Sequence, residues 1–191
     1  MESLRFGNAI LLSTSPPADP DSRIEWRQIP PMTKLDYSRF VLKELHHHIA
    51  TPHALIVQAD GFVLRPDLWE DGWLQFDYIG APWPPQLRVG KYVLEPCCRV
   101  GNGGFSLRSK RLLEMTSPID MSTLHFPSVS EDLVICHVLH DYLTGRGIRF
   151  ADIDTAARFA IEAPVSSAHR LGECFGFHGR RHLASLTAAE A

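Results

Sequence analysis

Short apolar runs along the chain, separated by polar and proline-rich segments, predict a series of strands. Residues 54–57 (Ala-Leu-Ile-Val) are the clearest run and are typical of a buried strand. Residues 8–12 predict a buried parallel strand, and residues 24–29 alternate apolar with polar side chains until the prolines at 30 and 31 stop them. The other strands are predicted over residues 77–83, where the chain is expected to leave the core, and over 105–108, 148–150, 159–161 and 175–178.

Apolar residues at helical spacing predict the helices. A first helix is expected over residues 33–49, with the threonine at its start as N-cap. A second helix is expected over residues 109–115. A third begins at Ser130 and ends at Gly145 or Gly147, and a terminal helix follows the last strand.

The order of these elements predicts the fold class. Strands that alternate with helices, together with two long loops over residues 84–99 and 116–129, indicate a mixed α/β sheet. The length of 191 residues fits a single domain with one core. A composition of 45% hydrophobic and 21% charged residues excludes a disordered, collagen-like or coiled-coil protein.

The charge balance and the cysteine content limit the classes of partner and the cell compartment that we expect. The chain has 19 Lys plus Arg against 22 Asp plus Glu, so it lacks the basic excess that holds a nucleic-acid backbone. We therefore expect no nucleic-acid partner. We also expect no transmembrane helix and no secretion signal, because long apolar runs are missing. The four cysteines, Cys97, Cys98, Cys136 and Cys174, show no metal-ligand spacing, which favours a reduced cytoplasmic protein.

Gln58 and Asp60 come directly after the clearest strand. Ligands of open α/β sheets bind beyond the carboxyl ends of the strands, where a carboxylate can hold the divalent cation of a nucleotide. An Asp-Gly turn in which Asp60 only caps the loop explains the same residues.

The segment from Gly101 to Gly104 offers a second candidate. Glycines let the backbone approach a ligand and present its N–H groups, but the spacing matches neither the P-loop nor the dinucleotide pattern. A tight turn before the next strand is the alternative.

Glu131, Asp132 and His178 are the remaining candidates. The two acids at a helix start suit either a general base beside a metal or simple stabilisation by the helix dipole. His178 follows Phe175, Gly176 and Phe177, and a lone histidine suits a structural role as well as a ligand role.

The order of these signals resembles that of GT-A nucleotide-sugar glycosyltransferases, and more closely an uncharacterised domain family of GT-A-like transferases. The matching residues are 55–62, 77–83, 100–109, Glu131 with Asp132, and 175–178. The resemblance as a whole covers most of residues 8–180, and the segment Val-Gly-Asn-Gly-Gly-Phe-Ser-Leu-Arg-Ser at 100–109 is its most specific part.

The resemblance implies a GT-A-like mixed sheet flanked by helices, of the Rossmann-like nucleotide-diphospho-sugar transferase type. It implies one domain over residues 1–191, with a donor and metal half at 8–83 and an acceptor and catalytic half at 100–180. Residues 181–191 would form a C-terminal tail. The chain opens near the expected second strand, so we expect the first GT-A strand to be absent.

The resemblance also assigns roles at the matching positions. Asp60 and His178 would hold Mn²⁺ or Mg²⁺, and Asp132, with Glu131 as the second choice, would deprotonate the acceptor. The donor and acceptor would contact Gln58, Trp83, Asn102, Gly103 and Gly104, with the Trp83 ring as a platform for a sugar. Gln58 stands where the GT-A motif has its first acid and brings no charge, so we expect weaker metal affinity.

The function implied is a metal-dependent glycosyltransferase that moves a sugar from a nucleoside diphosphate donor to a hydroxyl acceptor with inversion. The acceptor would be a glycan or another hydroxyl compound, and analogy to the fold suggests polysaccharide or surface-glycan assembly. Gln58 and the missing strand favour a non-catalytic carbohydrate- or nucleotide-binding relative instead. A metal-dependent phosphohydrolase shares the Asp and His chemistry but is expected to carry more carboxylates.

Overall fold

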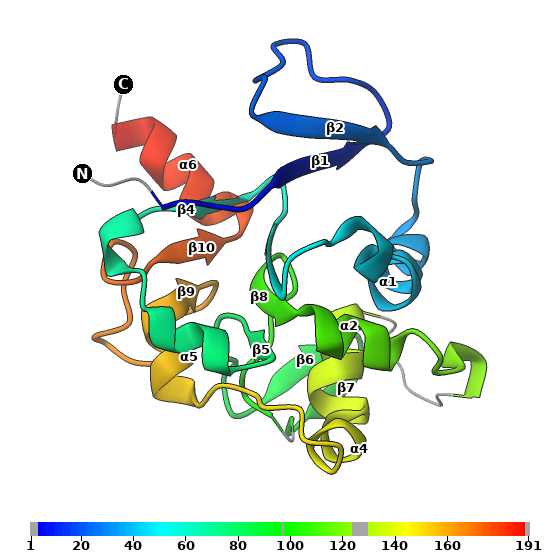
Figure 1. Cartoon of the computed structure of the whole chain (residues 1–191). Helices are drawn as coiled ribbons and strands as arrows, with labels where there is room; N and C mark the ends of the chain where they lie inside the picture. Colours follow the sequence, from blue (N-terminus) through cyan, green and yellow to red (C-terminus); the bar gives the residue numbers. More distant parts are fainter. Residues whose placement is uncertain (1–3, 97, 124–129, 190–191) are drawn as a thin grey trace.

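A computed structural model describes residues 4–96, 98–123 and 130–189 of the chain (Figure 1). The strands are β1 Ala9–Ser13, β2 Ile24–Gln28, β3 His53–Val57, β4 Gly61–Val63, β5 Tyr78–Ile79, β6 Leu87–Val89, β7 Tyr92–Leu94, β8 Phe105–Ser109, β9 Ala160–Ile161 and β10 Gly176–His178. The α-helices are α1 Lys34–Lys43, α2 Lys110–Thr116, α3 Glu131–Leu133, α4 His140–Thr144, α5 Ile153–Phe159 and α6 Arg180–Ala189. A π-helical turn, η5 Val134–Val138, joins α3 to α4, and short 3₁₀ helices are η1 Leu45–His48, η2 Pro66–Leu68, η3 Asp71–Gln75 and η4 Met121–Thr123.

The described strands form four small sheets. β3, β8 and β5 are antiparallel with β8 in the middle, and β10 lies between antiparallel β4 and parallel β9. β1 and β2 form a parallel pair at one end of the molecule, and β6 and β7 form a hairpin (Figure 1). The mixed α/β class is confirmed, although these strands do not join into one flanked sheet.

Local sequence explains where the helices begin. The Thr33 side chain accepts a hydrogen bond from the Asp36 N–H at the start of α1, and the Asp36 side chain accepts one from the Thr33 N–H. These two reciprocal bonds form a capping box. Ser109 caps α2 through a hydrogen bond from the Leu112 N–H. The predicted N-cap of the first helix is therefore confirmed, and the expected single helix from Ser130 runs as α3, the π turn and α4.

Some expectations need correction. β3, predicted as the clearest buried strand, is half-buried, whereas β8 in the middle of its sheet is fully buried. The prediction of a loop over 84–99 was wrong for residues 87–94, which form the β6–β7 hairpin around Gly90 at φ 59°. The segment predicted to leave the core at 77–83 stays buried throughout.

Other expectations fall partly outside the described residues. In the expected loop at 116–129, residues 121–123 form η4, and residues 124–129 lie outside the described ranges, as does Cys97. Most of the expected C-terminal tail, up to residue 189, belongs to α6. Within the described ranges, no helix is long and apolar enough to cross a membrane.

Four buried aromatic rings hold the centre of the core. Trp73, Phe105, Phe159 and Phe175 pack with ring centroids 5.2–5.9 Å apart. They come from η3, β8, α5 and the residue before β10, so one cluster ties together segments from both halves of the chain.

Glycines allow close approach around this cluster. A Cβ atom added at Gly176 would lie 2.2 Å from the Phe105 ring, so β10 passes directly against that ring. A Cβ atom added at Gly80 would lie 1.6 Å from the Gly101 carbonyl oxygen. The backbone after β5 therefore touches the backbone before β8.

We expect Gly80→Ala to lower the free energy of unfolding by about 3 kcal/mol or more, since the added methyl group meets backbone that has no room to move. Gly72→Ala is the matched control, because a Cβ atom there meets nothing within 4 Å. Its effect should stay within about 1 kcal/mol. Urea unfolding of both variants measures the difference, and equal effects would contradict the tight backbone contact.

Candidate functional site

The turn after β3 places the first candidate residues. The Gln58 N–H donates to the Gly104 carbonyl at 2.8 Å, and the Gly61 N–H donates to the Gln58 carbonyl at 2.9 Å. The Gly179 N–H donates to the Asp60 carbonyl at 2.9 Å. The turn is therefore held between the start of β8 and the end of β10, which carry Gly104 and His178 to the same place.

The side chains of Gln58, Asp60 and His178 converge beside this turn. His178 Nε2 lies 3.1 Å from Asp60 Oδ1 and 3.2 Å from Gln58 Oε1. The His178 and Asp60 side chains are 17% and 28% exposed, so the group is accessible from one side. The backbone forms the Asp-Gly turn that was the alternative explanation for Asp60. The Asp60 carboxylate nevertheless faces the His178 imidazole.

Glu162 lies on the other side of the imidazole ring. Its Oε1 is 3.4 Å from His178 Nδ1. The hydrogen bond and charge of Glu162, with a smaller contribution from Asp60, raise the pKa of His178 against the effect of its burial. A carboxylate at the second ring nitrogen is the usual partner of a metal-binding histidine, because it orients the ring.

The converging atoms fit a divalent cation. Octahedral ligands at about 2.1 Å from Mg²⁺ lie about 3 Å from one another, which is the separation observed around His178 Nε2. Within the described ranges, no group of three or more His, Cys, Asp or Glu side chains is arranged to hold a metal. The third donor here is the amide oxygen of Gln58, a ligand type that hard cations accept.

Gly103 and Gly104 lie between this cluster and a second one. A Cβ atom at Gly104 would lie 2.1 Å from His178 Nε2, and one at Gly103 would lie 1.7 Å from Glu131 Oε1. Asn102 before them has φ 62°, and its Oδ1 accepts from the Gly104 N–H at 3.1 Å. The side-chain amide of Asn102 thus holds the turn, and two adjacent glycines touch the two clusters.

The second cluster contains a buried ion pair and a half-buried acid. Arg108 Nη2 donates to Glu131 Oε1 at 2.9 Å and to the Gly103 carbonyl at 3.4 Å. Asp132 Oδ2 accepts from the Gly103 N–H at 3.3 Å. Burial, followed by the charge of Glu131, raises the pKa of Asp132 to about 6. Glu131 is committed to Arg108, which leaves Asp132 as the acid that can exchange a proton.

Trp83 lies elsewhere. It is 5% exposed, and its ring covers Gly101, where a Cβ atom would meet it at 1.9 Å. A sugar platform has to expose a ring face, whereas the structure places this ring in the core behind the glycine turn.

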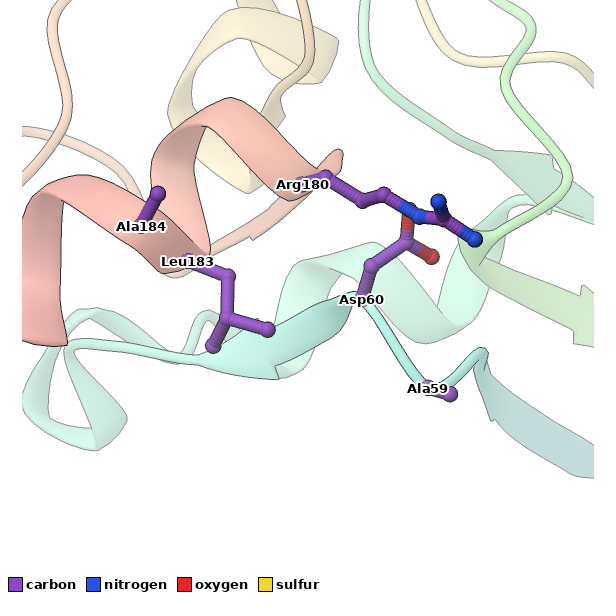
Figure 2. Close-up of a pocket in the computed structure, with 5 residues that line it drawn as sticks. All are labelled: Ala59, Asp60, Arg180, Leu183 and Ala184. Atoms are coloured by element: carbon purple, nitrogen blue, oxygen red, sulfur yellow. The ribbon is translucent and has the colours of Figure 1, made fainter.

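A shallow cavity of about 470 Å³ adjoins Asp60. Its walls are Ala59 and Asp60 on one side and Arg180, Leu183 and Ala184 of α6 on the other. Figure 2 shows the Arg180 side chain extending from the start of α6 toward Asp60. An exposed guanidinium beside the candidate cation site suits an anionic ligand.

Sequence reasoning missed four residues of this site: Tyr37, Arg108, Glu162 and Arg180. Arg108 belongs to the specific motif at 100–109, which was a usable signal, and Arg180 follows His178 by two positions. Tyr37 lies on α1, where its hydroxyl accepts from Gln58 Nε2 at 2.7 Å, and Glu162 directly follows β9. Neither position carries a sequence signal, so only the tertiary fold shows these contacts.

These features define an α/β protein with an imidazole–carboxylate centre on one side of a glycine turn and a half-buried acid on the other. A model of a family described as proteins of unknown function, DUF5672, matches residues 27–178, and the chain belongs to this family. No curated protein and no solved structure matches the chain.

The raised pKa of Asp132 predicts a pH effect on stability. The native state holds this proton up to about pH 6, whereas the unfolded chain releases it near the ordinary aspartate pKa of 3.8. The stabilisation is thus present below pH 3.8 and is lost as the pH rises to about 6.

As the pH rises from 3.8 to about 6, the free energy of unfolding of Asp132→Asn should increase relative to that of wild type by up to about 3 kcal/mol. Urea unfolding at several pH values measures it, with Asp19→Asn in an exposed loop as control. A difference that does not change with pH would contradict the assignment.

Proposed function

We propose that the protein is a metal-dependent glycosyltransferase of the GT-A type, which transfers a sugar from a nucleoside diphosphate donor to a hydroxyl acceptor with inversion. One observation carries the proposal. Two adjacent glycines contact a candidate cation site, Asp60 with His178, and a candidate base, Asp132 beside Glu131. Such a transfer needs a cation for the leaving diphosphate and a base for the acceptor close to one another, and here two adjacent glycines lie between the two groups.

Asp132 takes the proton of the acceptor hydroxyl in the proposed reaction. With a pKa of about 6 it is ionised at pH 7, and the Gly103 N–H holds its Oδ2 in place. The acceptor oxygen forms a bond to the anomeric carbon as the bond to the donor diphosphate breaks. The nucleoside diphosphate leaves with that electron pair, and the proton remains on Asp132.

Asp60, His178 and Gln58 would hold Mn²⁺ or Mg²⁺, which neutralises charge on the leaving diphosphate when bound. Arg180 lines the adjoining cavity and is placed to pair with diphosphate oxygens. The acceptor class proposed is a glycan or another hydroxyl compound. A cytoplasmic setting agrees with the thiol state of Cys136 and Cys174.

A second candidate is a non-catalytic relative that binds a nucleotide or carbohydrate. The observation that favours it is Gln58, because an amide in place of an acid leaves Asp60 as the one carboxylate, among the residues that the structure describes, in contact with His178 Nε2. Turnover distinguishes the two candidates, since a binding relative neither transfers sugar nor hydrolyses a donor.

Thermal unfolding with Mn²⁺ and a panel of nucleoside diphosphates and nucleotide sugars tests the binding half of the proposal. A ligand at about 100 times its dissociation constant stabilises by roughly 2.7 kcal/mol, which is a shift of about 5 to 10 °C at this length. We expect a metal-dependent shift that Asp60→Asn and Arg180→Ala reduce and the exposed control Asp154→Asn retains. No shift with any ligand would overturn the first candidate and the nucleotide-binding form of the second.

Release of nucleoside diphosphate tests the catalytic half. Asp132→Asn should lower the rate at least about 100-fold and keep the thermal shift, because the base is lost while the binding groups remain. The wild-type rate should fall as the pH drops below about 6. Loss of binding in Asp132→Asn would remove its assignment as the base, and binding without turnover in wild type would favour the second candidate.

A further inference from the structure

Gln58 carries the ambiguity of every glutamine side chain. Its amide has an oxygen on one side, which attracts a cation, and an NH₂ group on the other, which repels one. A neutral residue at this position therefore contributes to a cation site only when something fixes which side faces the site.

Tyr37 contacts the NH₂ side. Gln58 Nε2 donates to the Tyr37 hydroxyl at 2.7 Å, and Gln58 Oε1 lies 3.2 Å from His178 Nε2. Burial and the charge of Glu131 raise the pKa of Tyr37, so its hydroxyl stays neutral. The oxygen of a neutral hydroxyl accepts a hydrogen bond, as it does here from Gln58 Nε2.

The fold anchors Tyr37 independently of Gln58. Tyr37 lies on α1 and packs against the small core cluster of Val41, Leu45 and Leu113. Gln58 follows β3, on a different element, and its own backbone is fixed by the bond to Gly104. The hydroxyl therefore meets the amide from a rigid support.

We propose that Tyr37 is a positioning residue that turns the Gln58 amide so that its oxygen joins Asp60 and His178 as the third ligand of the divalent cation. This inference rests on the proposed function, since it gives a role at the same cation site. Tyr37 and Glu162 then act alike. Tyr37 contacts the amide nitrogen of Gln58, and Glu162 contacts Nδ1 of His178. Each contact leaves the ligand atom, Gln58 Oε1 or His178 Nε2, facing the cation site.

The proposal makes a specific prediction about a carboxylate at position 58. A glutamate presents oxygen on both branches, so its ability to bind a cation does not depend on which branch faces the site. The Tyr37 hydroxyl should therefore strengthen cation binding when residue 58 is glutamine, and this effect should vanish in Gln58→Glu.

The experiment measures Mn²⁺ binding by the intensity of free Mn²⁺ in electron paramagnetic resonance, with and without inorganic pyrophosphate as a stand-in for the donor diphosphate. The proteins are wild type, Tyr37→Phe, Gln58→Glu and the double variant. Tyr92→Phe, an exposed tyrosine on β7, is the matched control. We expect Tyr37→Phe to weaken Mn²⁺ binding about tenfold in the Gln58 background and less than about twofold in the Gln58→Glu background.

The outcomes separate the inference from the function beneath it. Equal loss in both backgrounds would mean that Tyr37 only supports packing, and no loss in either would mean that the amide needs no support. Either result overturns the inference while Mn²⁺ binding by wild type leaves the proposed function standing. Failure of both wild type and Gln58→Glu to bind Mn²⁺ with pyrophosphate would remove the cation site and the inference together.

Discussion

The contact between the Phe105 ring and the backbone of Gly176 is the constraint on which the site depends. The ring occupies the space where any other residue at 176 would carry its Cβ atom, so the start of β8 lies against β10. Gly104 directly precedes Phe105, and His178 lies two residues after Gly176. The contact therefore brings Gly104 and His178 together. The Gln58–Gly61 turn is hydrogen-bonded to both segments and so brings Asp60 to the same place. Hydrophobic packing in the core thereby sets the separation of polar groups at the surface.

Beneath the glycine turn, the Arg108–Glu131 pair has a different role. Two buried charges cost desolvation energy, and their mutual attraction offsets it only when the remaining hydrogen bonds are made. Here Arg108 also donates to the Gly103 carbonyl and the Ser106 hydroxyl, which connects the pair to the turn it supports, but its Nη1 is buried and has no hydrogen-bond partner among the described residues. Burial, followed by the charge of Glu131, raises the pKa of Asp132, whereas the charge of Arg108 lowers it. The ion pair therefore supports the turn, and its acid adds to the effect of burial on the neighbouring carboxyl group.

Local signals predicted the elements far better than their assembly. The capping residues Thr33 and Ser109 and the apolar run before Gln58 mark elements close to where they occur, because caps and periodicity are properties of neighbouring residues. The division into four small sheets depends on pairings between distant segments, which no local pattern encodes. For the candidate site, motif order singled out Asp60 and His178, which the fold brings together. It gave Trp83 as a sugar platform, although the fold buries this ring, because burial is not visible in motif order. It missed Tyr37 and Glu162, whose roles arise from contacts across the fold.

Asn102 and Gly103 form the dipeptide that ages fastest in proteins, since the glycine nitrogen readily attacks the asparagine side-chain carbonyl and converts the residue to aspartate or isoaspartate. In the native fold that nitrogen directs its N–H at Asp132, and the asparagine carbonyl accepts from Gly104 and Phe105. The left-handed backbone and the burial of Asn102 restrict the rotation that the attack requires. Chemical decay at this position therefore has to pass through opened molecules, and the working lifetime of the turn is set by how seldom the domain unfolds.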